Sequence, residues 1–216
     1  MNKYSELANS VTFTKRKSVI AQIHQDPSLE YIGKGRSAVV FKIWGANKAL
    51  KVFYPGYTNV AREEAAIYNV LQNSPYYPTL YEAGRNYLVI DLIEGHTLFE
   101  CLAKGIRVSS DKIKEIDVAL NLAREKGLNP SDIHLRNIFI TKEGKIKLID
   151  VARFRQAKDC SQWGDLKSAF YKYYSRTFFP KRIPVLILNL IAALYKKNII
   201  PLTKKRTPKS VVFFLC

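Results

Sequence analysis

The segment 129–154, NPSDIHLRNIFITKEGKIKLIDVARF, contains Asp132, Asn137 and Asp150. Apolar residues alternate on either side of Lys142-Glu143-Gly144, which predicts a β-hairpin with Asn137 before its first strand and Asp150 at the end of its second. The two side chains then lie close together at the open end of the hairpin. Their oxygens are ligands suited to Mg²⁺ held jointly with phosphate oxygens. Asp132 would be near enough to meet a nucleophile beside that metal, although a turn or helix-capping aspartate is the plainer interpretation.

A second group of residues, nearer the N-terminus, could bind an anion. Gly33–Val40, GKGRSAVV, lies between two predicted strands, where glycines let backbone N–H groups come close to an anion. A tight turn would explain the same glycines. Lys51 is centred in the apolar strand ALKVF, where an ammonium needs a charged partner unless the strand is an exposed edge. Glu64, on the sheet-facing side of a predicted helix, is the partner we expect, whereas Glu63 projects differently, to the surface.

The elements that position these residues form a β-rich half and then a mainly helical half, with the boundary near Glu94-Gly95. Residues 1–27 are predicted to be a basic helical lead-in. Alternating apolar positions predict strands within residues 29–53, 78–84 and 86–93, and apolar residues at helical spacing predict helices over 59–73 and 109–128.

The composition is that of a folded protein with an uneven charge. Hydrophobic residues make up 47% of the 216 residues and charged residues 25%, which allows a real core and excludes general disorder. The formal net charge is +17, to which residues 151–216 contribute +12 and residues 1–132 only +3. A field of this sign and size favours an acidic partner.

Three features bear on where the protein acts. The three cysteines, Cys101, Cys160 and Cys216, suit neither a disulfide framework nor a metal site, so a reducing cytoplasm is expected. The N-terminal residues lack the apolar run of a signal peptide. The most apolar stretch, Ile183–Leu194, is short for a membrane span and predicts a buried helix, with a membrane-embedded segment as the alternative.

With these motifs in this order, the chain resembles a protein kinase, specifically a small bacterial eukaryotic-type serine/threonine protein kinase, from roughly Leu29 to Asp165. The resemblance implies an α+β, two-lobed fold with a β-rich N-lobe and a short, mainly helical C-lobe. It implies ATP and Mg²⁺ as cofactors and transfer of the γ-phosphoryl group to serine or threonine of a protein. The corresponding divisions are the lead-in at 1–27, the N-lobe at 28–94, the C-lobe at 95–200 and a basic and apolar tail at 201–216.

The resemblance also assigns roles to the residues of the two groups. Asp132 takes the proton of the substrate hydroxyl, while Asn137 and Asp150 hold Mg²⁺. Lys51 pairs with Glu64 and with the α- and β-phosphates. The residues implied to contact the nucleotide are Ile32, Gly33, Lys34, Gly35, Arg36, Ser37, Ala38, Val39, Val40, Lys51, Glu64, Asp91 and Ile93.

Two further stretches resemble kinase elements. YLVIDLIEGHTL is similar to the hinge, with Ile90 at the gatekeeper position and Asp91–Ile93 contacting adenine through backbone groups. WGDLKSAF is similar to the start of the helix that supports the catalytic loop, with Asp165 as its buried anchor.

The chain departs from the kinase pattern at several points. Pro130-Ser131 stands where the family has His-Arg, and Asp150-Val151-Ala152 stands for Asp-Phe-Gly. Ala38 replaces the third glycine of the Gly-rich loop. Only 15 positions separate Asp150 from Asp165, which leaves no room for a full activation segment, and no Ala-Pro-Glu motif is present.

These departures leave two other functions open. A small-molecule kinase of the aminoglycoside or sugar type is favoured by the short C-terminal half and by His134, which follows Asp132 by two residues as in aminoglycoside phosphotransferases. The short C-terminal half also resembles that of RIO-type kinases. A nucleotide-binding scaffold with little catalysis is favoured by the changes beside Asp132 and Asp150. For the basic C-terminal part, which includes Thr203–Lys209 and the apolar Val211–Leu215, the predicted partner is first an acidic protein, second an anionic membrane surface and third nucleic acid.

Overall fold

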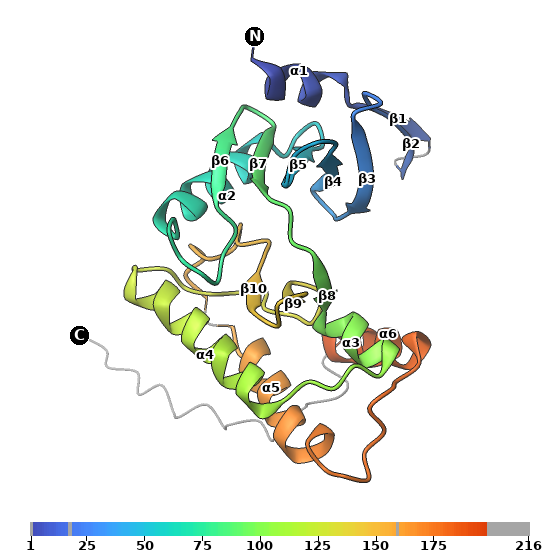
Figure 1. The fold of residues 1–216 in the computed structure, drawn as a ribbon, viewed down its shortest axis with the longest axis vertical. Helices are drawn as coiled ribbons and strands as arrows, with labels where there is room; N and C mark the ends of the chain where they lie inside the picture. Colours follow the sequence, from blue (N-terminus) through green and yellow to red (C-terminus); the bar gives the residue numbers. More distant parts are fainter. Residues whose placement is uncertain (1, 17–18, 159, 198–216) are drawn as a thin grey trace, which may run out of the picture.

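Five antiparallel strands make the sheet of the upper lobe in Figure 1, in the order β3-β4-β5-β7-β6. The computed structural model describes residues 2–16, 19–158 and 160–197. All five strands lie within segments predicted to be strands. Their bounds are Leu29–Lys34 for β3, Ala38–Ile43 for β4, Lys48–Phe53 for β5, Leu80–Ala83 for β6 and Tyr87–Asp91 for β7.

The two faces of this sheet pack against different helices, because successive side chains of a strand point to opposite sides. Leu50 and Val52 belong to a hydrophobic cluster with α1 (Lys3–Ser10). Lys51, between them, therefore faces the other side, where α2 (Thr58–Val70) packs. Strand alternation thus turns the lysine toward α2 while its neighbours secure the strand.

The prediction that residues 1–27 form a helical lead-in is wrong beyond Ser10. Strands β1 (Thr12–Arg16) and β2 (Val19–His24) form an antiparallel hairpin there. The β-branched residues of VTFT and VI favour an extended chain over a helix. Leu7 of α1 is 7% exposed and joins the cluster on the outer face of the sheet. The first helix is therefore packed into the N-lobe.

The lower lobe is mainly helical and contains a small three-stranded sheet (Figure 1). The predicted hairpin is present as β9 and β10, and β8 adds a third strand that the sequence did not predict. Gly95 lets β8 come this close, since a Cβ there would lie 2.2 Å from the Ile140 carbonyl oxygen. The elements are β8 (Gly95–Thr97), α3 (Leu98–Lys104), α4 (Ser110–Glu125), β9 (Ile138–Thr141), β10 (Ile146–Leu148), α5 (Gln162–Ala169), the π-helical turn η1 (Phe170–Tyr174) and α6 (Val185–Lys196).

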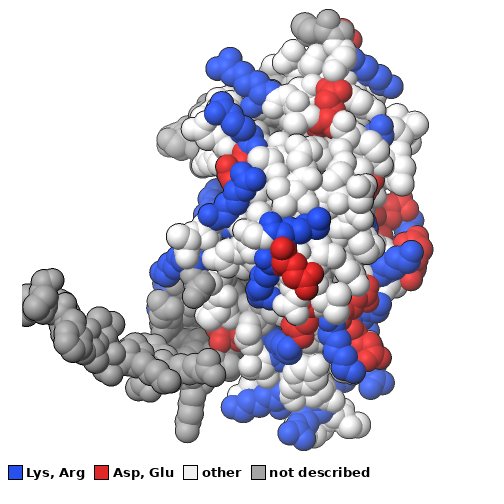
Figure 2. Space-filling model, turned by 90° about the vertical axis from the view of Figure 1, so that its left-hand side faces the viewer, with Lys and Arg blue, Asp and Glu red and all other residues white. Residues whose placement is uncertain are grey.

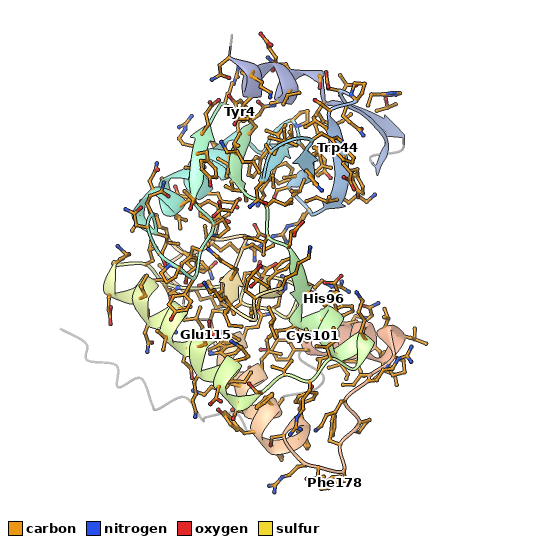
Figure 3. All side chains as sticks on the ribbon, in the orientation of Figure 1. Tyr4, Trp44, His96, Cys101, Glu115 and Phe178 are labelled. Atoms are coloured by element: carbon orange, nitrogen blue, oxygen red, sulfur yellow. The ribbon has the colours of Figure 1, made fainter. Side chains whose placement is uncertain are left out.

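Helix α6 lies where a helix is predicted, but the prediction that it is buried is wrong. Among its apolar residues only Leu188 is buried, while Leu186 is 80% exposed. The helix lies on the outside of the lobe beside α3 (Figure 1). Phe178, in the loop before α6, is 87% exposed and lies at the far end of the lobe (Figure 3). No helix in the described part of the chain is both long and apolar enough to cross a membrane.

The arrangement is the predicted α+β, two-lobed, kinase-like fold.

The charge of the chain is unevenly distributed along the sequence. The face that carries α2 and α4 shows basic and acidic side chains interspersed (Figure 2), and on α4 Lys112 pairs with Glu115 at 2.6 Å. This mixture agrees with the near balance of charge in residues 1–132.

Leu7→Ala is expected to lower the free energy of unfolding by about 2–4 kcal/mol, because it removes a buried side chain between α1 and the sheet. Urea denaturation followed by circular dichroism measures the change. Lys3→Ala, at an exposed position of the same helix, is the control and should change stability by less than about 0.5 kcal/mol. Equal effects of the two substitutions would contradict the packing of α1 on the sheet.

Candidate active site

Lys51 is the centre of a charge cluster that joins the two lobes. Its Nζ atom lies 2.7 Å from both carboxylate oxygens of Glu64 on α2 and 3.1 Å from Oδ1 of Asp150 in the C-lobe. Lys51 is 8% exposed and Glu64 is fully buried. Glu63 pairs instead with Arg155 at the surface, at 3.2 Å. The structure therefore places the lysine beside Glu64 and not beside its neighbour.

The opposite charges of this cluster stabilise one another, whereas burial raises the pKa of the Glu64 carboxyl above its usual value and Asp150 adds to that effect. Burial alone would lower the pKa of the Lys51 ammonium, but Glu64 and Asp150 outweigh it and raise that pKa above its usual value. Burial would raise the pKa of the Asp150 carboxyl, but Lys51 outweighs it, with help from His134 and Arg36, and lowers that pKa below its usual value. Asp150 is therefore an anion at neutral pH.

The Gly-rich hairpin connects β3 to β4. The Gly35 N–H donates to the Ala38 carbonyl oxygen at 2.8 Å, which closes the turn. Neither Gly33 nor Gly35 has a left-handed backbone, and a Cβ at Gly33 would meet none of the described atoms within 4 Å. The fold itself does not require glycine here. The open space over the backbone is what an approaching anion needs.

Asn137 and Asp150 meet at the open end of the β9–β10 hairpin. The Ile149 N–H donates to the Asn137 carbonyl oxygen at 2.9 Å, and Asp150 is the next residue. The side-chain amide of Asn137 donates to the Asp132 carbonyl oxygen at 3.2 Å, so its side-chain oxygen is the atom left for a metal. In the described ranges, no group of three or more His, Cys, Asp or Glu side chains could hold a metal by itself. A metal at this point would share Asn137 and Asp150 with oxygens of a ligand, which fits Mg²⁺.

Asp132 is held beside this pair by an arginine that the sequence did not single out. Its Oδ2 lies 3.2 Å from Nη1 of Arg153. The backbones of Asp132 and Asp150 are both left-handed, with φ of 61° and 59°, a conformation that aspartate tolerates better than most residues. Ser131, where the family has arginine, is fully buried and its hydroxyl donates to the Asn129 carbonyl oxygen. Arg153 thus supplies the positive charge beside Asp132 that Ser131 lacks.

The residues after Asp150 fold back on the loop that carries Asp132. Phe154 is fully buried and packs edge-on against Tyr77, with ring centroids 6.1 Å apart. Its carbonyl oxygen accepts the Asn129 N–H at 2.6 Å. The Asn129 side chain donates to the Gln156 carbonyl oxygen at 2.9 Å. A short, tied segment therefore occupies the place of a long activation segment.

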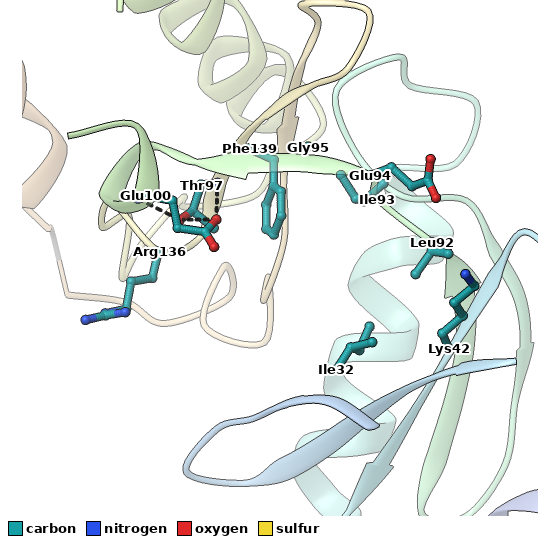
Figure 4. Close-up of a pocket in the computed structure, with 10 residues that line it drawn as sticks. All are labelled: Ile32, Lys42, Leu92, Ile93, Glu94, Gly95, Thr97, Glu100, Arg136 and Phe139. Atoms are coloured by element: carbon teal, nitrogen blue, oxygen red, sulfur yellow. Dashed lines mark hydrogen bonds between the residues drawn. The ribbon is translucent and has the colours of Figure 1, made fainter. Parts of the chain in front are cut away.

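A pocket of about 450 Å³ opens between the lobes (Figure 4). Ile32 of β3 and Phe139 of β9 line it from opposite sides, and Leu92, Ile93 and Glu94, which connect β7 to β8, line a third. Apolar side chains on two sides and a backbone segment on the third suit a flat, partly apolar ligand.

The residues predicted to contact a nucleotide are not all brought to this pocket. Ile32 and Ile93 line it, but Asp91 does not. The Asp91 carboxylate accepts hydrogen bonds from the Thr79 N–H at 2.8 Å and the Tyr81 hydroxyl at 2.7 Å. The side chain of Val39 is fully buried in the cluster on the outer face of the sheet, so only its backbone is available to a ligand.

Three residues near the site were missed in the sequence. Arg153 and Phe139 have no local signal, because only the folded chain shows what they face. Tyr68 could have been found, since it follows Glu64 by one helical turn. It is fully buried, and burial raises the pKa of its phenol well above its usual value, with Glu64 and Asp150 adding to the effect.

Asp165 differs from the buried anchor that was predicted. It is half-buried, and its Oδ2 accepts hydrogen bonds from the Ser161 hydroxyl at 3.2 Å and the Tyr195 hydroxyl at 2.7 Å. It therefore ties the start of α5 to the end of α6.

The fold, with this charge cluster between its lobes, is that of the kinase class of phosphotransferases. No family model matches the chain. The chain is 46% identical over 200 residues to "Putative serine/threonine-protein kinase YrzF" of Bacillus subtilis (strain 168), and the match covers 92% of the chain and 93% of that relative. The chain belongs to the serine/threonine-protein kinase family, which confirms the resemblance seen in its motifs.

Two more distant relatives match over shorter stretches. Ribosomal protein S6 kinase alpha-2 of Homo sapiens is 30% identical over 95 residues, covering 40% of the chain and 13% of that relative. Atypical protein kinase C of Drosophila melanogaster is 28% identical over 115 residues, covering 50% of the chain and 18% of that relative.

Glu64→Gln is expected to lower the free energy of unfolding by about 2–4 kcal/mol, because it leaves the buried Lys51 ammonium with Asp150 as its remaining anion. Glu63→Gln removes a surface carboxylate one position away and should change stability by less than about 1 kcal/mol. Urea denaturation of the two variants in parallel checks the difference. A stability of Glu64→Gln equal to that of Glu63→Gln would show that the buried pair does not matter to the fold.

Proposed function

We propose that the protein is a serine/threonine protein kinase that transfers the γ-phosphoryl group of ATP, with Mg²⁺, to a protein hydroxyl. The observation that carries the proposal is the cluster of Lys51, Glu64 and Asp150, with Asn137 and Asp132 beside it. The Asp150 side chain remains 46% exposed although it contacts Lys51, so it can still reach a ligand in the cleft. Membership of the kinase family supports the same activity.

The nucleotide is expected to occupy the pocket and the space under the Gly-rich hairpin. Adenine fits between Ile32 and Phe139, against the backbone of Leu92–Glu94. The hairpin amides and Arg36 face the phosphates, and Lys51 donates to a phosphate oxygen. The hairpin glycines leave the backbone free to approach.

The chemistry depends on positioning and on charge. Bound Mg²⁺ would neutralise phosphate charge, and Asn137 and Asp150 supply its protein oxygens. Asp132 accepts a hydrogen bond from the substrate hydroxyl and takes its proton as the new oxygen–phosphorus bond forms and ADP leaves. Arg153 holds the Asp132 carboxylate in position from the side.

We also propose an acidic protein as the substrate and the cytoplasm as the location. Arg36 and Arg136 are exposed close to the candidate site, where they attract acidic residues around a hydroxyl. The basic Thr203–Lys209 and the apolar Val211–Leu215, on which the sequence prediction also drew, lie outside the described residues. Cys101 and Cys160 are free thiols, as a reducing compartment allows. The relatives are named as protein kinases, which does not favour a small-molecule kinase or a scaffold.

The function is tested with purified protein, Mg²⁺, γ-labelled ATP and a cell lysate. Label is expected on serine or threonine of proteins, with Asp or Glu near the labelled hydroxyl. Label found in small molecules alone would contradict a protein substrate. Binding of Mg·ATP without any transfer would favour the scaffold instead.

Asp150→Asn should abolish transfer while the protein stays folded, because the variant loses the main charge that holds Mg²⁺. Glu143→Gln, an exposed carboxylate at the tip of the same hairpin, is the matched control and should keep full activity. The labelled-ATP assay measures activity, and circular dichroism shows that the variants are folded. Wild-type activity in Asp150→Asn would overturn the kinase site.

Asp132→Asn separates catalysis from binding. The variant keeps the nucleotide and metal contacts but loses the proton acceptor, so turnover should fall by a factor of roughly 10² or more while ATP affinity stays unchanged. Turnover is measured with the labelled substrate, and ATP affinity by titration calorimetry. A parallel loss of ATP affinity would indicate that Asp132 shapes the nucleotide site and is not the base.

A further inference from the structure

Helix α6 presents an apolar face that stays partly or largely exposed in the described part of the chain. Leu186, Ile187, Leu190 and Ile191 are spaced so that they lie on one side of the helix. They are 80%, 47%, 55% and 37% exposed, in that order. A contiguous apolar surface of this kind usually marks a contact with a protein partner or a membrane.

The opposite side of α6 is fastened to the C-lobe. Leu188 is buried, and the Asn189 side-chain oxygen accepts a hydrogen bond from Nη2 of Arg136 at 3.0 Å. The Tyr195 hydroxyl donates to Asp165 at 2.7 Å. These contacts hold the helix in one orientation. The apolar face is therefore a fixed outward surface of the fold.

Positive charge stands at both ends of this face. Arg182 precedes the helix and Lys197 follows its last residue, whereas the Lys181 ammonium donates to the Tyr174 and Arg176 carbonyl oxygens of its own lobe. Arg182 and Lys197 are exposed. The sequence contains no Asp or Glu after Asp165, so no acidic side chain of this segment offsets these cations.

We propose that α6 docks on the surface of an anionic lipid bilayer. The four apolar side chains enter the boundary between headgroups and acyl chains, and the cations at the two ends face lipid phosphates. A helix of 12 residues is about 18 Å long, which is short of the roughly 30 Å of a bilayer core, so it lies along the surface.

Other occupants match only half of this surface. An acidic protein or a nucleic acid would pair with the cations but leave the four apolar side chains in water. A second copy of the chain would cover the apolar face but bring like charges together. Because α6 lies outside the cleft, the proposal does not depend on the kinase activity.

The test is sedimentation of the full chain with vesicles of phosphatidylglycerol mixed with phosphatidylcholine, and with vesicles of phosphatidylcholine alone. Binding is expected with the anionic vesicles and should weaken as salt is raised. The double variant Leu186→Ser/Leu190→Ser should bind at least roughly tenfold more weakly, because two apolar side chains no longer leave water. Val118→Ser, a 51% exposed apolar position on α4, is the control and should bind as the wild type does.

A second pair of variants tests the charge. Arg182→Ser/Lys197→Ser should flatten the salt dependence of vesicle binding, while Arg62→Ser/Lys114→Ser, with the same change in net charge on exposed positions of α2 and α4, should leave it unchanged. Absence of binding to anionic vesicles, or binding that Leu186→Ser/Leu190→Ser does not weaken, overturns the proposal. Light scattering that shows a dimer dispersed by the same double variant also overturns it, in favour of a second copy.

Discussion

The burial of one ammonium group constrains the rest of this molecule. Lys51 lies in the interior, where a cation is stable only when anions contact it. One anion comes from α2 and the other from the C-lobe, so the sheet, the helix and the hairpin must meet within hydrogen-bonding distance. The rotation of α2 that selects Glu64 over Glu63 follows from this requirement. So does the closeness of the two lobes at this point.

On the C-lobe side of the site, the segment after Asp150 supplies the arginine that stands beside the proposed base. Ser131 is buried and takes no part in the charge balance, and Arg153 stands beside Asp132 instead. The arginine comes from the segment after Asp150, which is itself fixed by Phe154 in the core. The position of the proposed base thus depends on a segment that is already packed. A long loop that must first be ordered is not needed for it.

Two surfaces of the molecule differ in what they offer to partners. The cleft is polar and charged, with the pocket between Ile32 and Phe139 at one end. The outer face of α6 is apolar with cations at its ends. Arg136 lies between them, since it lines the pocket and also holds Asn189 of α6. A contact at α6 is therefore one hydrogen bond away from the loop that carries Asn137.

Local pattern alone determined much of this protein. Alternating apolar residues predicted the N-lobe strands and the hairpin. Pairing of the two hairpin strands, which are neighbours in the sequence, then brings Asn137 and Asp150 together. The tertiary structure alone decided the rest. Arg153 reaches Asp132 only after the chain folds back, and only the folded sheet shows that α1 packs into the N-lobe. The apolar run at α6 predicted a helix but not its exposure, since hydrophobicity fixes the preference of a side chain for leaving water and not which surface will cover it.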